Sequence, residues 1–419
     1  MRALALLVLA TVGCTSPGPV TPTPTPTAES GVLTVVALLD LSGPRAAIGT
    51  QQRDALQLFA QQPGGTVPSL RLRTVDVAGS DAKLLIELRR AAVEETADAV
   101  IVGPPVTYDD TLGRAIDLAR MPILFTQPLA ADPAGRMGGR WAFALAPPLS
   151  RLAELAIDDA YQRDVLLPSL VLTEGRERVD PMAGALTAEM ERRRLEPLTR
   201  VAIPADGSVA PVVRSSLSVL RSVHCTALPS SCVSLATLAR SSSAPTFFYL
   251  SYLTAPSDLA DHAELAQRAV FPGSRALLPV ATRPLRPIDQ ARERFVQAFG
   301  EKYGPAGTHA AVAYDALALV AAATERSGPD DRAALRDALE RISMSLIAST
   351  YTFGPDRHAG SDPADVAYLR WAGSTLAPAL LPSLGTGLPT PAPSATPVRS
   401  PSPLRSPSAS PSRSPSTKP

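Results

Sequence analysis

Two cysteines in the second half of the chain, Cys225 and Cys232, lie close enough in the sequence to form a covalent link. The chain has three cysteines, so these two remain as a pair if Cys14 serves another purpose. Outside the cytoplasm an even remainder of thiols favours a disulfide. We therefore expect a Cys225–Cys232 disulfide, and two reduced thiols are the alternative.

The third cysteine, Cys14, ends a stretch that is typical of secretion and lipid attachment. Arg2 precedes the apolar run Ala3–Ala10, which is too short for the roughly 20 residues that span a bilayer. The residues Thr11-Val12-Gly13-Cys14 resemble a bacterial lipobox. The sequence predicts a signal peptide over residues 1–13 and lipidation at Cys14; a cleaved signal followed by an incidental cysteine is the alternative.

Motifs that would indicate an enzyme or a metal centre are missing from this sequence. It contains no G-x-S-x-G elbow, no Walker A loop and no H-E-x-x-H pair. Its four histidines do not have the spacing of metal ligands. We expect neither catalysis, nor a metal, nor a cofactor. The histidines are His224, His262, His309 and His358.

Composition separates a folded body from two terminal segments. The chain has 43 prolines, and their density is highest in residues 16–28 and 389–419. Residues 14–30 alternate Thr and Pro, which predicts an extended tether, and residues 387–419 predict a disordered Ser/Pro/Arg-rich tail. The net charge is +1, and the body between these segments is mildly acidic without a basic stripe, which argues against a nucleic-acid partner.

Apolar runs alternate with helical patterns along this body. Val32–Leu39 is a continuous apolar run, which predicts a strand buried on both faces. Strands followed by helices recur after it, which predicts an α/β protein with mostly parallel sheets. Ser349–Phe353 and Ala367–Ala372 are expected to form a final strand pair.

Four stretches of the body resemble the leucine-binding family of type I solute-binding proteins. They read VVALLDLSGPRAAIGTQQRDALQLFA, MPILFTQPLAADPAGRMGGRWAFALAPP, YGPAGTHAAVAYDALALVAAATERSGPDDRAALRDAL and TFGPDRHAG…YLRWAGSTL. The resemblance implies a periplasmic-binding-protein type I fold: two Rossmann-like lobes with parallel sheets, joined by a three-strand hinge. Lobe one would comprise residues 31–146 with 279–345, and lobe two residues 147–278 with 346–380.

The resemblance also implies a cleft at the carboxyl ends of the strands, where loops and helix N-termini meet a ligand. Related proteins bind ligands through hydroxyl and main-chain groups here, and an arginine could clamp a carboxylate. No acidic residue occurs near the end of the strand TFFYLSY before Asp258, unlike relatives that bind amino acids. The ligand-binding candidates are Ser42, Gly43, Thr107, Tyr108, Ala130, Ala131, Arg178, Ser251 and Tyr252, and plain turns, loops or solvated side chains are the alternative for each.

The function that follows from the resemblance is capture of a small polar ligand, amino-acid-like or amide-like, for an ABC importer. We expect a lipid-anchored monomer on the outer face of the cell membrane whose partners are the ligand and the permease subunits. The alternative is a lipid-anchored ligand sensor of the same fold that is not coupled to transport.

Overall fold

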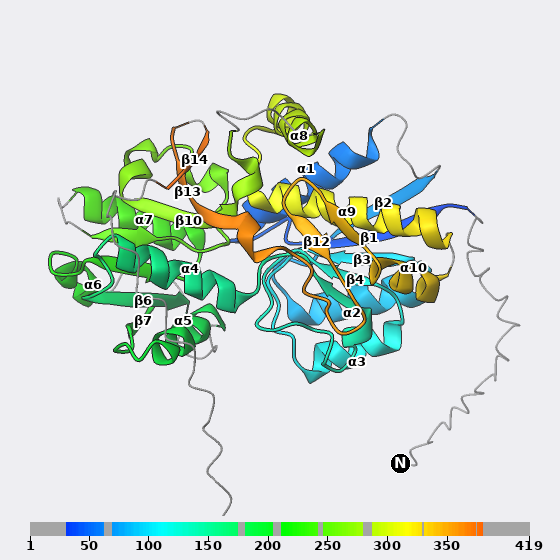
Figure 1. Cartoon of the computed structure of the whole chain (residues 1–419), viewed down its shortest axis with the longest axis horizontal. Coiled ribbons are helices and arrows are strands. Elements are labelled where there is room, and N and C mark those ends of the chain that lie inside the picture. The colour runs from blue at the N-terminus through cyan, green and yellow to red at the C-terminus, as the bar shows by residue number, and fades with distance from the viewer. Residues whose placement is uncertain are drawn as a thin grey trace, which may run out of the picture.

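The computed structural model describes residues 31–62, 69–174, 181–203, 211–241, 246–279, 287–328, 331–373 and 375–379. They form two α/β lobes that lie side by side (Figure 1). The predicted signal peptide with Cys14, the tether and the C-terminal tail lie outside the described residues, so these three predictions stay predictions.

Lobe one is built on a five-stranded parallel sheet with the order β2-β1-β3-β4-β5. Successive residues of β1 pack into different cores: Val35 joins the core on one face and Val36 the core on the other. A strand buried on both faces has no polar side to show, which explains its uninterrupted apolar sequence. The strands are β1 (Leu33–Leu39), β2 (Leu70–Asp76), β3 (Ala99–Val102), β4 (Ile123–Phe125) and β5 (Ala142–Ala144).

Helices cover both faces of this sheet (Figure 1). The core on one face includes side chains of α1 and α9, and the core on the other includes side chains of α2 and α3. Two of these helices begin at side-chain caps, because Ser80 accepts the Lys83 amide and Asp109 accepts the Leu112 amide. The helices of lobe one are α1 (Ala46–Ala60), α2 (Asp81–Val93), α3 (Asp110–Ala119), the short η1 (Gly139–Trp141), α8 (Pro287–Tyr303), α9 (Thr308–Ser327) and α10 (Arg332–Leu339).

Lobe two contains a seven-stranded sheet with the order β14-β13-β10-β9-β8-β6-β7. The pairs from β7 to β10 are parallel, whereas β13 and β14 add an antiparallel edge. The strands are β6 (Ser169–Glu174), β7 (Thr199–Ile203), β8 (Ser222–Cys225), β9 (Phe247–Tyr249), β10 (Ala269–Ser274), β13 (Val366–Trp371) and β14 (Leu376–Pro378). The helices are α4 (Leu149–Gln162), α5 (Pro181–Arg192), α6 (Pro211–Ser216), α7 (Pro229–Ser241), and the short η2 (Pro256–Leu259), η3 (Ala263–Gln267), η4 (Arg275–Leu277) and η5 (Pro363–Asp365).

The chain passes between the lobes three times: after β5, after β10, and between β12 and β13. The third passage begins later than the predicted boundary at residue 345, because Ala359 still forms a bridge with Ala144 of lobe one. The predicted final strand pair is wrong. β12 (Thr350–Thr352) pairs with β11 (Ser343–Ser345) in a separate hairpin, while β13 joins the sheet of lobe two.

The predicted disulfide is confirmed. Cys225 at the end of β8 is bonded to Cys232 in the first turn of α7, with a Cα–Cα distance of 5.8 Å. Both side chains are buried in the core of lobe two. The link therefore joins a central strand to the helix that follows it.

Within the described residues, no single helix is long and apolar enough to cross a membrane. The helices α8 and α9 meet these criteria only as a pair, and that pair is bent by 115°.

Candidate ligand site between the lobes

Loops that follow the strands of lobe one carry the first group of polar side chains. Ser42, after β1, donates a hydrogen bond from its hydroxyl to Asp76 Oδ2 at 2.6 Å, and the Leu41 amide donates to Oδ1 at 2.8 Å. Burial acts to raise the pKa of Asp76, but these hydrogen bonds to the carboxylate outweigh it and lower the pKa. Gly43 has a φ of +77°, a conformation that favours glycine.

A buried glutamine ties the ends of β3 and β4 together. Gln52 of α1 donates from Nε2 to the Gly103 carbonyl at 3.0 Å and to the Thr126 hydroxyl at 2.9 Å. Thr126 in turn donates to the Val102 carbonyl. A Cβ on Gly103 would lie 2.4 Å from Gln52 Oε1, so a larger residue here would displace the Gln52 side chain. The strand ends are therefore held in place from α1.

Residues from both lobes meet at the N-terminus of α9, and we call this contact the seam; it comprises Gln127, His309 and Tyr252. Gln127 is the second residue after β4, and its amide nitrogen lies 3.2 Å from Nδ1 of His309. The edge of the His309 ring faces the ring of Tyr252, with centroids 5.3 Å apart at 90°. Since Gln127 and His309 belong to lobe one and Tyr252 to lobe two, the contact between His309 and Tyr252 crosses the interface.

His309 is neutral at physiological pH in this environment. Its side chain is 1% exposed, and burial lowers its pKa to about 4, although the Tyr252 main chain partly opposes the shift. The Tyr252 side chain is also buried, and its hydroxyl group has no partner among the described residues. The seam thus concentrates uncharged hydrogen-bonding groups where the two lobes touch.

A second glutamine of α1, Gln51, holds the chain just before α9, the helix that carries His309. Gln51 of α1 donates to the Pro305 carbonyl at 2.9 Å and accepts the Gly307 amide at 3.0 Å. A Cβ on Gly307 would lie 2.7 Å from Pro256 of lobe two, so the backbone of one lobe nearly touches the other here. The first turn of α9 is therefore positioned by α1 and pressed against lobe two.

The three passages enclose a small cavity next to the seam, and we call it the hinge cavity. Its walls include Tyr252 from the seam and Thr308 from the start of α9. Asp365 accepts hydrogen bonds from the Ser349 hydroxyl and the Thr350 amide, which fastens the third passage to β12. The lining residues are Leu145, Pro147, Tyr252, Gly273, Ser274, Thr308, Val312, Ala348, Ser349, Tyr351, Ser361, Asp362, Asp365 and Val366.

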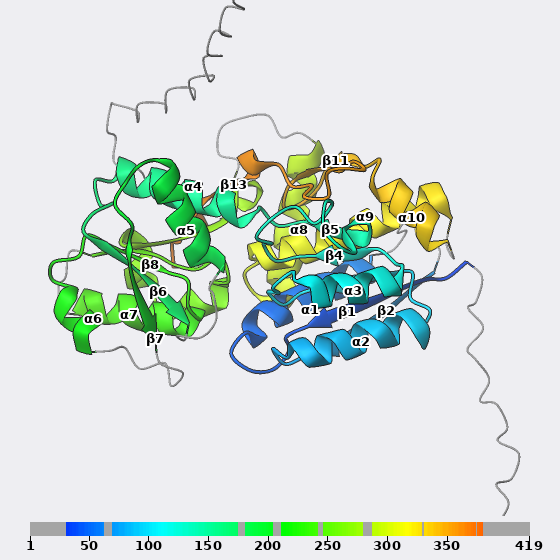
Figure 2. The ribbon, with the colours of Figure 1, turned by 90° about the horizontal axis from the view of Figure 1, so that it is seen from below.

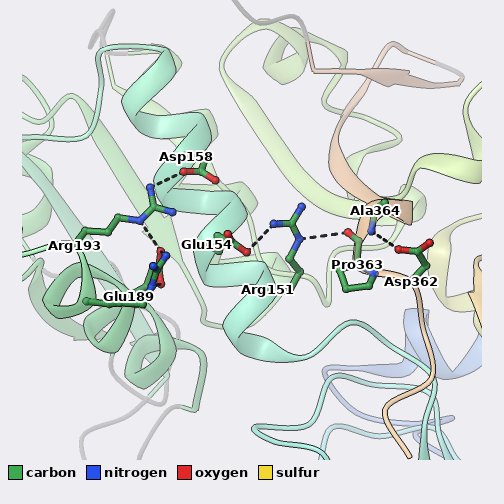
Figure 3. A network of polar contacts seen from close by, with 9 residues as sticks. Arg151, Glu154, Asp158, Glu189, Arg193, Asp362, Pro363 and Ala364 are labelled. Atoms are coloured by element: carbon green, nitrogen blue, oxygen red, sulfur yellow. Dashed lines mark hydrogen bonds and ion pairs between the residues drawn. The ribbon is translucent and has the colours of Figure 1, made fainter. Parts of the chain in front are cut away.

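Charged side chains on α4 connect lobe two to the third passage (Figure 3). Arg151 donates to the Pro363 carbonyl at 3.3 Å and pairs with Glu154 at 2.7 Å. Further along the same helix, Asp158 pairs with Arg193, which also bonds Glu189. The passage is thereby held to α4 on one side and to β12 on the other.

The predicted ligand-binding residues fall into three groups. Tyr252 lies in the seam, and Ser251 next to it accepts the Leu253 amide. Tyr108 instead faces its own lobe, where its hydroxyl donates to the Met137 carbonyl and its ring packs against Phe125. The third group consists of exposed loop residues: Ser42, Gly43, Thr107, Ala130 and Ala131. Arg178 lies outside the described residues.

Sequence reasoning missed Gln127 and His309. Thr126-Gln127 directly follows an apolar strand run, and His309 stands near the start of a long predicted helix. Polar residues at these two kinds of position were the available signal, because strand ends and helix starts meet at one edge of an α/β sheet. Among the described residues, no three His, Cys, Asp or Glu side chains group together as a metal site would need.

Comparison with known proteins places this geometry in context. Residues 219–374 match the family described as "Periplasmic binding protein". None of the curated proteins compared with the chain matches it. An extracellular ligand-binding receptor from Rhodopseudomonas palustris HaA2 is 16% identical, with a TM-score of 0.68 over 83% of this chain and 99% of that one.

Two further solved structures were determined with a bound small molecule. The branched-chain amino acid transporter substrate-binding protein LivJ from Streptococcus pneumoniae, in complex with isoleucine, is 14% identical, with a TM-score of 0.67 over 82% of this chain and 97% of that one. An ABC transporter solute-binding protein from R. palustris, in complex with benzoate, is 18% identical, with a TM-score of 0.66 over 85% and 100%. At these identities the likeness establishes the fold alone.

Proposed function

We propose a function from the premise that this chain has the two-lobed fold of the type I periplasmic binding proteins, as its resemblance to the leucine-binding family predicts. The function is that of an extracytoplasmic solute-binding protein. It captures a small polar ligand, amino-acid-like or amide-like, between its lobes and delivers it to an ABC importer. The protein is a lipid-anchored monomer, and its partners are the ligand and the permease subunits.

The observation that carries this proposal is the seam. Uncharged polar groups of both lobes are buried there, and the hydroxyl of Tyr252 has no partner among the described residues. Burying such groups is unfavourable unless something completes their hydrogen bonds. A polar solute that enters when the lobes part would complete them, and its contacts to both lobes would favour the closed arrangement.

The structures with isoleucine and with benzoate support a small-molecule ligand but leave its class open. Ser42, Gly43, Thr107, Ala130, Ala131, Ser251 and Arg178 stay candidates for the ligand shell, alongside the seam residues. Tyr108 stays one only through its main chain, since its hydroxyl is bound to Met137.

Thermal unfolding of the whole chain against a panel of solutes tests the proposal. The panel contains branched-chain and other amino acids, short amides, urea, aromatic acids and nucleobases. A true ligand at 100 times its dissociation constant adds about 2.7 kcal/mol to the free energy of unfolding, a shift of several degrees. A shift confined to one chemical class identifies the ligand.

A matched pair of variants ties a shift to the seam. Gln127→Ala removes the amide that orients His309. We expect this variant to need at least ten times more ligand than the unchanged protein for the same thermal shift. Gln297→Ala, on the exposed face of α8 where Gln297 bonds Glu301, should leave the shift unchanged. If cooperatively folded protein shows no shift with any solute, the importer function fails and a sensor of a protein partner becomes the better explanation.

A further inference from the structure

The turn between β11 and β12 is bonded to the second passage between the lobes. We call residues 346–349 the anchor turn; it closes with a hydrogen bond from the Leu346 amide to the Ser349 carbonyl at 2.8 Å. The Ser274 hydroxyl, at the end of β10, donates to the Ala348 carbonyl in this turn. Ala348 and Ser349 are buried, and both line the hinge cavity together with Ser274. The second passage is therefore attached to lobe one at a buried point.

The third passage reaches the same turn. The Ser349 hydroxyl donates to Asp365 Oδ2 at 3.1 Å and accepts the Asp362 amide at 3.1 Å. Directly after the turn, the Thr350 amide donates to the same oxygen of Asp365 at 2.8 Å, and the Thr350 carbonyl accepts the Asp362 amide at 2.9 Å. In lobe two the two passages belong to the neighbouring antiparallel strands β10 and β13. Two adjacent strand ends thus meet lobe one at one turn.

Two buried side chains hold the anchor turn from α8 and α9. Asp315 of α9 accepts the Ile347 amide at 2.9 Å through Oδ1 and the Ala348 amide at 2.7 Å through Oδ2. Arg292 of α8 donates to the Leu346 and Ile347 carbonyls, both at 3.1 Å. Asp315 is 0% exposed, so bulk water does not reach its bonds. The position of the turn therefore depends on one carboxyl group and one guanidinium group.

The first passage is attached elsewhere. The Leu145 amide, directly after β5, donates to the Phe125 carbonyl of β4 at 2.9 Å. The Leu149 amide, at the start of α4, donates to the Leu129 carbonyl in the loop after β4 at 3.2 Å. The first passage is therefore held by β4 and its loop, and it provides an internal reference for the other two.

We propose that the anchor turn is a shared attachment point that couples the second and third passages, and that Asp315 holds it in place. Without Asp315, the Ile347 and Ala348 amides lose their acceptor, and a buried donor without an acceptor is unfavourable. The turn then opens, and Ser274 and Asp365 lose their partners on it together. Proteins open locally in contiguous cooperative units of this kind. The coupling needs no solute and is independent of the proposed function.

Amide hydrogen exchange of the whole chain can follow each passage separately. The Ala276 amide reports on the second passage, because it donates to the Ser274 hydroxyl at 3.2 Å. The Asp362 amide reports on the third passage, and the Leu145 amide on the first. The measurements are made without solute, so their failure is distinct from a failure of the solute panel.

Asp315→Asn replaces one acceptor oxygen by an NH2 group, which cannot accept an amide of the turn. We expect exchange to become at least about tenfold faster in the anchor turn and also at Ala276 and Asp362. Leu145 should keep its rate. The matched control is Asp109→Asn, the same change on a carboxylate that accepts two amides at the start of α3; it should leave all three passages unchanged.

Two further variants keep the test decisive. Arg292→Gln loosens the turn from its carbonyl side, so it should accelerate Ala276 and Asp362 together even if Asp315→Asn does not fold. Ser349→Ala removes only the link to the third passage, so it should accelerate Asp362 and leave Ala276 unchanged. Acceleration of both by Ser349→Ala would assign the coupling to the pairing of β10 with β13 and overturn the proposal. Acceleration confined to the anchor turn in Asp315→Asn and Arg292→Gln would overturn it as well.

Discussion

His224 is a buried histidine at the centre of the lobe-two sheet. Its ring stacks on Tyr249 with centroids 4.6 Å apart at 7°, and neither ring nitrogen has a partner among the described residues. Complete burial lowers its pKa from the ordinary 6.5 to about 3. The unfolded chain therefore takes up a proton more readily than the folded one between these pH values, and stability falls as the pH drops through that window.

The variant His224→Phe tests this residue. It removes the titrating group and keeps a flat ring against Tyr249. At pH 8 both proteins carry no charge at this position, so the comparison there measures packing alone. We compare the free energy of unfolding of the variant with that of the unchanged protein. At pH 5 this difference should favour the variant by about 2 kcal/mol more than at pH 8, because the lowered pKa destabilises the unchanged protein by about 1.4 kcal/mol per pH unit below 6.5. Urea denaturation at the two pH values measures it, and an equal difference at both would contradict it.

Residues of the seam show how far the sequence alone could reach. Tyr252 was accessible to prediction because it ends an apolar strand run, and strand ends gather at one edge of the sheet. The pairing of Gln127 with His309 was not, since 182 positions separate them and only the folded lobe brings them together. Tyr108 shows the opposite error: a loop position suggests access to a cleft, but its ring is drawn into the core beside Phe125.

At the scale of elements, the disulfide fixes the first turn of α7 relative to the end of β8. Cys225 ends β8 and Cys232 stands in the first turn of the helix, so the bond sets the direction in which the chain leaves the sheet. A seven-residue separation closes a short loop, for which the loss of entropy in the unfolded chain is worth about 2–3 kcal/mol.

Removal of this bond gives a second stability prediction. We expect the Cys225→Ala/Cys232→Ala variant to lose about 2–3 kcal/mol in guanidinium denaturation under oxidising conditions. Adding a thiol reductant should weaken the unchanged protein by a similar amount and leave the variant unaffected. If the reductant destabilises both proteins equally, its effect does not come from the Cys225–Cys232 disulfide.

Other elements differ in how much of their structure is determined by their own local sequence. β1 and α9 were predictable because a long apolar run and a long helical pattern carry their own signal. The pairing of the last strands was not predictable, because it depends on strands that are distant in the sequence. β11 is a three-residue strand, Ser343–Ser345, without an apolar alternation, and only its register with Thr350–Thr352 reveals it. β13 is instead recruited by β10 of lobe two.

On the scale of the whole molecule, one group of buried apolar side chains includes members of both lobes. Val35 of β1, Ala313 of α9 and Phe248 of β9 all belong to it. Figure 2, turned by 90°, also shows the lobes side by side. The three passages and this shared core join the two lobes, each with its own sheet. The positions of the passages depended on contacts such as Ala144 with Ala359.

The membrane anchor is a prediction at this scale. Expressed in its host with its own leader, the unchanged protein should sediment with membranes and carry an acyl mass on Cys14. Cys14→Ser should release it into the extracytoplasmic soluble fraction with its ligand-induced thermal shift intact. Membrane association that survives this substitution would place the anchor elsewhere in the chain.

The two ends of the folded body belong to different lobes: β1 opens lobe one at Leu33, and β14 closes the sheet of lobe two at Pro378. A lipid on Cys14 would therefore connect the membrane to lobe one and leave lobe two free to move. With that anchor, opening and closing of the lobes would change the distance of β14 from the membrane, while β1 keeps its place.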